Sequence, residues 1–569
     1  MQNLISLGGI FVLLFIAWLM SEDRRRFPWR VVIWGMALQL IFGFLVLLWK
    51  PGAQAFLVLN DIFNGLLSFS REGAIFVFNS IGSADASGPV PSLKDYLTRI
   101  GATSTDPIVQ NAVRNGTVPG FFFAFQVLAT IIFFSALLSV LYYLGVMQKV
   151  VLLFARIMNR TMGVSGAESL SNAANIFVGQ TEAPLVIRPY LEKMTRSELM
   201  AIMVGGFSNT AGGVLGAYVL MLVGFFPNIA SHLIAASVLS APAAFMIAKI
   251  LVPEREVPLT KGEVKLDVEI TDANVIDAAA NGTTVGWNLA INVGAMLISF
   301  VALVAMVNFA MSSLGGLFRD GSGLLRFNLM MAAAVASLIY VRRFGAPRDD
   351  TKMWLALLAL VGLAIAMRAA GFLTLSSFLM FGGLAAWLPL FLQAGEKRTY
   401  GSTIWMTLAG AAVAANLGYA IWGPLGSGSE LSLQLVLGWL HWPIAFIMGV
   451  PAQDCLAIGK LLGEKLILTE FGAYLDLSNQ LAAAARGEVP PLDPRSLVIV
   501  SYALCGFANV ASIAIQIGGL APLAPSRRGE IARLGFKAMI GGALATFIIA
   551  CVAGLFYTGH STLGITGSR

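Results

Sequence analysis

The sequence predicts an all-α polytopic membrane protein, an inverted repeat with two re-entrant helical hairpins and broken helices. Hydrophobic residues make up 57% of the 569 residues and charged residues only 12%, so water-facing surface would be scarce in any soluble arrangement. Apolar runs near the length of roughly 20 residues that crosses a bilayer recur along the chain. Two further apolar segments are interrupted by glycine, proline and a carboxylate, which is typical of hairpins that enter the membrane without crossing it.

Each predicted span is an apolar run bounded by polar or charged residues. The first run lacks a basic leader and a small-residue cleavage site, so it is interpreted as a retained helix. The segments Phe56–Ile81 and Asn274–Ala280 are predicted to be helices near the interface. The predicted spans are Leu4–Met20, Val31–Trp49, Phe121–Met147, Leu199–Phe226, His232–Val252, Trp287–Met311, Phe327–Val341, Met353–Ala370, Phe372–Leu392, Thr403–Trp422, Leu497–Leu523 and Phe536–Tyr557.

The basic residues predict the orientation of the spans. Arg24, Arg25, Arg26 and Arg30 follow the first run, which places that loop in the cytoplasm and the N-terminus outside. Counting the crossings also places the C-terminus outside, for a multi-pass protein of the cytoplasmic membrane. The net charge of +7 is spread over the loops, so the sequence does not predict a nucleic-acid partner.

The interrupted segments are Gly163–Tyr190 and Pro443–Leu475. In a lipid-facing helix, broken backbone would leave polar groups without partners, whereas a hairpin buried among other helices tolerates it where it lines a cavity. We therefore predict one hairpin in each half of the chain.

The two halves carry the same short motifs. Thr181-Glu182 precedes Gly206-Phe207-Ser208-Asn209, and Thr469-Glu470 precedes Gly506-Phe507-Ala508-Asn509. With the predicted topology, the hairpins enter from opposite faces, so the halves are inverted copies. Paired broken helices in inverted halves indicate a substrate site near the membrane midplane and transport by alternating access.

The polar residues of these motifs predict the chemistry of the site. Glu182 and Glu470 need a hydrogen-bonding solute, a cation or a proton, because an unpaired carboxylate is costly in a membrane. Phe507 offers an apolar face to a ring, and the free carbonyl at Val178 with nearby amide and hydroxyl oxygens favours a sodium-type site. Amides and hydroxyls that suit a neutral polar solute are those of Asn175, Gln180, Thr181, Asn209, Asn509 and Ser512.

Four long runs of sequence resemble the concentrative nucleoside transporter family. They are FFFAFQVLATIIFFSALLSVLYYLGVMQ, GAESLSNAANIFVGQTEAPLVIRPYLEKMTRSEL, VIDAAANGTTVGWNLAINVGAMLISFVALVA and CGFANVASIAIQIGGLAP, and the resemblance covers most of Leu4–Met311 and Leu433–Tyr557. It implies a homotrimer in the lipid bilayer, in which each protomer imports a nucleoside with a coupled ion, sodium rather than a proton. No other cofactor and no enzymatic activity are expected.

The resemblance also implies roles for individual residues. Gln180 and Thr181 would contact the nucleobase near Val214, and Glu182 would act directly or through water. Phe507 would line the pocket. The ribose hydroxyls would be held by Glu470, Asn509 and Ser512, and the sodium ion by Asn175, Val178, Thr181, Asn209 and Thr210.

The sequence departs from the family pattern at Thr469, where the family usually has asparagine, and at Ala452, where it often has an aromatic residue. The larger departure is an insert of about four spans. The predicted domains are 1–160 (scaffold spans and interfacial helix), 161–252 (first transport half with hairpin 1), 253–314 (linker and scaffold span), 315–432 (the insert) and 433–557 (second transport half with hairpin 2).

Two alternative functions belong to other classes. An ion or proton channel would use the buried glutamates as a relay, but it would not need the amides around the hairpins. A membrane-embedded enzyme would use Glu182 as a general acid or base, but no nucleophile, metal set or cofactor motif accompanies it.

Overall fold

The computed structural model describes residues 2–78, 123–262, 272–319 and 432–559, which form helices, turns and loops. The chain divides into two compact units, one of Met1–Ala305 with Leu433–Arg569 and one of Met306–Ser432. In the second unit the structure describes helix residues up to Arg319. The predicted spans that lie outside the described residues are Phe327–Val341, Met353–Ala370, Phe372–Leu392 and Thr403–Trp422.

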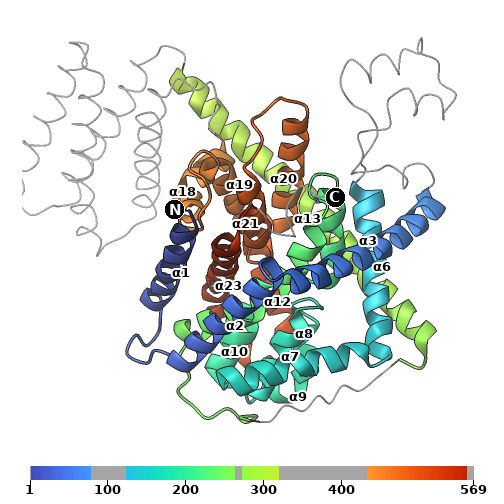
Figure 1. Ribbon diagram of the computed structural model, residues 1–569. Coiled ribbons are helices and arrows are strands. Elements are labelled where there is room, and N and C mark those ends of the chain that lie inside the picture. Colours follow the sequence, from blue (N-terminus) through green and yellow to red (C-terminus); the bar gives the residue numbers. More distant parts are fainter. Residues whose placement is uncertain (1, 79–122, 263–271, 320–431, 560–569) are drawn as a thin grey trace, which may run out of the picture. The chain divides into compact units, whose positions relative to one another are not determined.

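The first unit begins with three helices, α1 (Gln2–Leu19), α2 (Trp29–Leu47) and α3 (Lys50–Phe78), and then runs twice through the same order of elements (Figure 1). In each pass a long helix is followed by a shorter one, two hairpin arms, two half-helices and a final long helix. The first pass contains α6 (Phe123–Tyr143), α7 (Val146–Met162), α8 (Gly166–Asn175), η2 (Ala183–Ile187) with α9 (Arg188–Leu191), α10 (Arg196–Ser208), α11 (Gly212–Leu222) and α12 (Ile229–Leu251). The second contains α13 (Val275–Arg319), α18 (Leu433–Ile447), α19 (Cys455–Ile467), α20 (Glu470–Ala485), α21 (Pro494–Leu504), α22 (Val510–Leu520), η4 (Pro525–Arg527) and α23 (Arg528–Phe556).

Seven stretches of helix among the described residues are long and apolar enough to cross a membrane. α3 is not among them. The apolar helices α18, α21 and α22 are shorter than a full crossing. The described residues thus form the multi-pass helical membrane architecture that the composition predicts.

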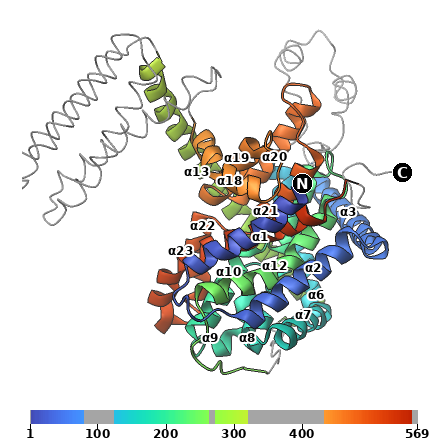
Figure 2. The same cartoon turned by 60° about the vertical axis from the view of Figure 1, so that its left-hand side comes forward.

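The core of the first unit lies around α12 and α23. α23 packs against α1, α10, α12 and α21, and α12 packs against α2 and α10; Figure 2 shows these helices together. α12 is buried along almost its whole length, whereas α1 exposes apolar side chains such as Phe11 and Phe15. Because lipid is the solvent of an outer helix in this class, such exposed apolar side chains are expected there.

The prediction of a separate interfacial helix at Asn274–Ala280 is wrong. These residues are continuous with the predicted span Trp287–Met311 in α13, which starts at Val275. The Asn281-Gly282 pair between them does not end the helix, because Gly282 packs against α6. A Cβ atom at residue 282 would lie 2.6 Å from Cβ of Ser139.

Two predicted continuous spans are each interrupted. Leu199–Phe226 is divided into α10 and α11 at residues 209–211, and Leu497–Leu523 into α21 and α22 at residues 505–509. We call these interruptions the first break and the second break. Hairpin 2 also begins later than predicted, because Pro443 lies inside α18 and the first hairpin arm starts at Cys455.

Candidate functional site

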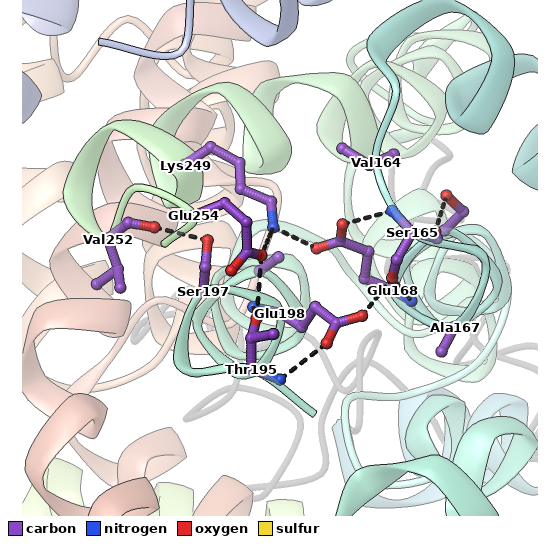
Figure 3. A network of polar contacts seen from close by, with 12 residues as sticks. Val164, Ser165, Ala167, Glu168, Thr195, Ser197, Glu198, Lys249, Val252 and Glu254 are labelled. Atoms are coloured by element: carbon purple, nitrogen blue, oxygen red, sulfur yellow. Dashed lines mark hydrogen bonds and ion pairs between the residues drawn. The ribbon is translucent and has the colours of Figure 1, made fainter. Parts of the chain in front are cut away.

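The base of hairpin 1 is fixed by a buried network of charges (Figure 3). The Lys249 ammonium of α12 lies 2.8 Å from a carboxylate oxygen of Glu168 on the hairpin and 3.3 Å from one of Glu254. On the hairpin side, the Ser165 hydroxyl donates to Glu198 of α10 at 2.5 Å. Ser165 forms a capping box with Glu168 at the start of α8, and Thr195 forms one with Glu198 at the start of α10. Hairpin 1 is therefore anchored to both α10 and α12.

The tip of hairpin 1 is bonded to the first break through neutral groups. The Asn209 side chain donates to the Asn175 carbonyl at 2.8 Å, and the Asn175 side chain donates to the Gly205 carbonyl at 2.7 Å. The Gly212 N–H, at the start of α11, donates to the Phe177 carbonyl at 2.9 Å. These bonds satisfy backbone groups that lack helical partners because α8 ends at the hairpin tip and because α10 and α11 are separated by the first break.

The two breaks lie against each other. The Thr210 hydroxyl in the first break accepts a hydrogen bond from the Gly506 N–H in the second at 2.9 Å. Gly506 has a φ of 104°, and a Cβ atom there would lie 2.7 Å from the carbonyl carbon of Ser208. Only glycine fits this backbone conformation at this distance. The repeated glycine of the motif thus allows the half-helices of the two repeats to meet.

Glu470 begins the second arm of hairpin 2 and lies where the two repeats meet. Its two carboxylate oxygens accept from the Tyr218 hydroxyl of α11 and from the Asn509 amide of the second break, both at 2.9 Å. The Asn509 oxygen in turn accepts from the Ser512 N–H at 2.8 Å, which caps α22 and fixes the amide's orientation. The carboxylate is therefore held in one position by groups from both repeats.

A cavity of about 320 Å³ lies beside Glu470. Side chains of α6, α11 and α13 close one side of it, among them Leu138, Val214 and Leu289. The cavity brings together all the residues for which a substrate contact is predicted, namely Gln180, Thr181, Glu182, Val214, Glu470, Phe507, Asn509 and Ser512. Their individual roles stay predictions.

Two polar atoms of hairpin 1 near this cavity have no hydrogen-bond partner among the described residues. They are Oε1 of Gln180 and Oε2 of Glu182, and both atoms are buried. Glu182 folds back over Gly179, where a Cβ atom would lie 2.3 Å from that carboxylate oxygen. Both atoms are acceptors, so they can pair with a ligand that carries N–H or O–H donors.

The residues predicted to bind sodium lie between hairpin 1 and the first break. Val178 and Thr181 line the cavity, whereas Asn175, Asn209 and Thr210 lie behind it and are buried. Among the described residues, no donor reaches the Val178 carbonyl, the Asn175 side-chain oxygen or the Thr181 hydroxyl. Thr210 directs its hydroxyl to the second break, so its carbonyl is the group left for an ion. This oxygen-rich donor set fits a hard monovalent cation.

The sequence reasoning missed two side chains that hold the site. Tyr218 lies one helical turn after Val214 on α11, and that spacing could have placed it on the same face. Lys465 is a buried charge inside hairpin 2, which is by itself an indication of function in a membrane segment. The pairing of either residue with a distant partner has no signal in the sequence.

Three family models match the chain. The N-terminus of Na+ dependent nucleoside transporters matches residues 8–81, and the C-terminus of the same class matches residues 232–361 and 402–554. A model described as nucleoside recognition matches residues 124–226.

Known proteins resemble the chain over almost its whole length. An uncharacterized transporter of Haemophilus influenzae is 34% identical over 557 residues, covering 98% of both chains. Sodium/nucleoside cotransporter 1 of Mus musculus is 32% identical over 98% of this chain and 64% of its own. Among solved structures, CNTnw in an inward-facing substrate-bound state is 32% identical, with 98% of both chains covered and a TM-score of 0.67. A CNTnw variant in an outward-facing state matches with a TM-score of 0.68.

Proposed function

The chain belongs to the concentrative nucleoside transporter family, and from this premise we propose how its cavity binds and moves its substrates. Its activity is Na+-dependent nucleoside cotransport, not enzymatic catalysis. Inward-facing and outward-facing states of its structural relative indicate alternating access. The protein lies in the cytoplasmic membrane as a multi-pass protein.

The nucleoside binds in the cavity beside Glu470. The observation that carries this proposal is the chemistry of the cavity wall. Unpaired acceptors on Gln180 and Glu182 lie on one side, and the fixed carboxylate of Glu470 lies on the other. A nucleoside has donors at both ends, the N–H groups of the base and the hydroxyls of the ribose. Acceptors of hairpin 1 therefore suit the base, and Glu470 with Asn509 suits the ribose.

The remaining predicted residues complete this arrangement. Thr181 contacts the base, Val214 and Phe507 pack against its ring, and Ser512 contributes to the ribose side. The coupled sodium ion is held at Asn175, Val178, Thr181, Asn209 and Thr210. The oxygens that no internal donor reaches support this assignment.

Sodium binding here would join hairpin 1 to the first break, next to the wall that contacts the base. A ligand shifts a conformational equilibrium only by its differential affinity for the two states. Sodium that binds the arranged hairpin tip more tightly than the loosened tip therefore favours nucleoside binding. This is the thermodynamic basis that we propose for the coupling.

We further propose that the protein is a homotrimer and that both of its termini lie outside the cell. The resemblance of the sequence supports a homotrimer in which the transport halves move against a scaffold, and the basic loop at Arg24–Arg26 supports both termini lying outside. Light scattering of the detergent-purified protein tests the trimer. Accessibility of single cysteines at the two termini to a membrane-impermeant reagent tests the topology.

Uptake of radiolabelled uridine into proteoliposomes tests the function. We expect uptake that requires external sodium, that stops when choline replaces sodium, and that a proton gradient cannot restore. Glu470→Gln should lower uptake by more than about 100-fold, because the carboxylate makes two hydrogen bonds worth about 1.5–3 kcal/mol each. Glu488→Gln is the matched control, since Glu488 lies in an exposed loop. Full uptake by the Glu470→Gln protein, or ion conduction without nucleoside, would contradict the proposal.

A further inference from the structure

Among the described residues, no carboxylate forms an ion pair with the buried ammonium of Lys465. Its side chain has no exposed surface. Its three N–H groups donate to the Ala503 carbonyl at 2.8 Å, the Cys505 carbonyl at 3.2 Å and the Thr546 hydroxyl at 3.0 Å. A buried charge with only neutral partners loses several kcal/mol of hydration, so its presence calls for an explanation.

The carbonyls that Lys465 binds are left open by the position of the second break. α21 ends at Leu504, before the Gly506-Phe507-Ala508-Asn509 motif, whereas α10 extends through its own motif to Ser208. No backbone N–H among the described residues reaches the Ala503 or Cys505 carbonyl, and both carbonyls lie at the negative end of the α21 dipole. In transporters with broken helices, carbonyls at such ends coordinate cations.

The register of the two motifs identifies the matching contacts in the first repeat. Cys505 precedes Gly506 as Gly205 precedes Gly206, and Ala503 corresponds in the same way to Met203. The Gly205 carbonyl accepts from the Asn175 amide at 2.7 Å, and the Met203 carbonyl accepts from the Gln516 amide at 3.0 Å. The same two carbonyls are thus held by neutral amides in the first repeat and by one ammonium in the second.

Lys465 also links the parts of the second repeat that form the cavity. It lies on α19, close before the turn that leads to Thr469 and Glu470, and it binds the chain that leads to Phe507 and Asn509. α23 supplies Thr546 and the ring of Phe547, whose centroid is 5.9 Å from the ammonium. The ammonium therefore joins the tip of hairpin 2, the second break and the core helix α23.

We propose that Lys465 is a positioning residue, the built-in cation of the second repeat, and that it holds Glu470 and Asn509 in their binding positions whether or not sodium is bound. The inference rests on the proposed nucleoside site. At the tip of hairpin 1 the proposed cation is a sodium ion, which can dissociate. At the tip of hairpin 2 the cation is the ammonium of Lys465, which is part of the chain. One sodium-dependent hairpin and one sodium-independent hairpin follow from this difference.

Lys465→Gln removes the charge and keeps two N–H donors on a side chain that is one bond shorter. Binding of uridine to the purified protein is measured by calorimetry at saturating sodium. We expect the Kd of the Lys465→Gln protein to rise at least about tenfold. Lys460→Gln, on the same helix, is the matched control and should leave the Kd unchanged. A wild-type Kd in Lys465→Gln would overturn the proposal, since a neutral spacer would then suffice.

Chemical rescue tests whether uridine affinity depends on the positive charge at this position or only on the volume of the side chain. Lys465→Ala leaves space for a small cation, so n-propylammonium should restore uridine affinity while the neutral isostere n-propanol should not. Equal effects of the two compounds, or none from either, would overturn the proposal. Thermal unfolding of each purified variant confirms that it is folded, and Lys465→Gln carries the test if the alanine variant does not fold. Failure of the wild-type protein to bind uridine with sodium would instead contradict the proposed function.

Discussion

The two repeats anchor their hairpins alike at the base and differently at the tip. At the base of hairpin 1, the Ser165 hydroxyl on the hairpin donates to the Glu198 carboxylate on α10. At the base of hairpin 2 the groups are exchanged, since the Ser496 hydroxyl on α21 donates to the Asp454 carboxylate before α19 at 2.6 Å. At the tips, the Asn175 amide of hairpin 1 donates to the Gly205 carbonyl near the end of α10, and the Lys465 ammonium of hairpin 2 donates to the Cys505 carbonyl in the second break.

The two tips therefore differ in whether an external cation can bind there. Both bases are closed by internal polar contacts, so neither depends on a dissociable ion. At the tip of hairpin 1, no donor among the described residues reaches the Val178 carbonyl, the Asn175 side-chain oxygen or the Thr181 hydroxyl. The proposed asymmetry of the inverted repeat therefore rests on two neutral amides at the carbonyls of the first repeat and one ammonium at those of the second.

The most damaging change removes the buried cation at the base of hairpin 1. Lys249→Met removes the cation beside Glu168, Glu198 and Glu254 and leaves carboxylates buried without compensation. We expect a loss of about 3–5 kcal/mol of stability, because breaking a buried ion pair strands the remaining charge. Thermal unfolding in detergent measures the loss. Lys261→Met, at an exposed position, is the control, and Lys249→Met combined with Glu168→Gln should recover part of the stability. A Lys249→Met protein as stable as the wild type would contradict this account of the anchor.

A second change tests the contact between the repeats at Glu470. Tyr218→Phe removes one of two donors to the carboxylate without changing the packing of the ring. A hydrogen bond to a charged group is worth about 1.5–3 kcal/mol, so we expect uridine affinity to fall by roughly 10- to 100-fold. Calorimetric titration with uridine measures it. Tyr190→Phe, on the outer part of hairpin 1, should have no effect. An unchanged Kd in Tyr218→Phe would show that Asn509 alone fixes the carboxylate.

The motif asparagines Asn209 and Asn509 test whether the two hairpin tips differ in their dependence on sodium. Asn209→Ala removes the bond to the Asn175 carbonyl, and we expect the sodium concentration for half-maximal uptake to rise about tenfold, with uptake restored at high sodium. Asn509→Ala removes a donor to Glu470, and high sodium should not restore its uptake. A sodium titration of uptake by both variants distinguishes these outcomes. Equal sodium dependence of the two variants would remove the functional asymmetry.

The smallest expected effect lies outside the membrane, at the loop after α1. The hydrogen bond from Arg196, assisted by Lys537, holds the pKa of the Glu22 carboxyl below its usual 4.5. Stability from this pairing is present above that pH and is lost as the pH falls through the lowered pKa. Glu22→Gln should cost no more than about 1 kcal/mol at pH 7, since the side chains are 30–40% exposed. The unfolding temperatures of the wild type and the variant should converge in acid; a constant difference at every pH would contradict the ionic origin.

Much of the fold and the site follows from local sequence. Hydropathy marks the spans because burial in lipid requires about 20 apolar residues, and glycine with a carboxylate marks the hairpins because only a cavity tolerates them. The recurring Thr-Glu and Gly-Phe-x-Asn motifs place the cavity residues, since the two copies must meet at the centre of an inverted repeat. The position of the helix end in each motif was not predictable, because Gly506 breaks α21 and Gly206 leaves α10 intact.

Hydropathy and motif repetition are properties of the chain, so the apolar segments and the polar residues of the shared cavity could be predicted from the sequence. The partners of those residues depend on how the helices pack. Tyr218 reaches Glu470 from α11, Lys465 reaches the end of α21, and Gly506 lies against Ser208. These pairs are far apart in sequence, and hydrogen bonding between them requires donor and acceptor atoms to approach within about 3 Å. Packing of the helices alone fixes that distance.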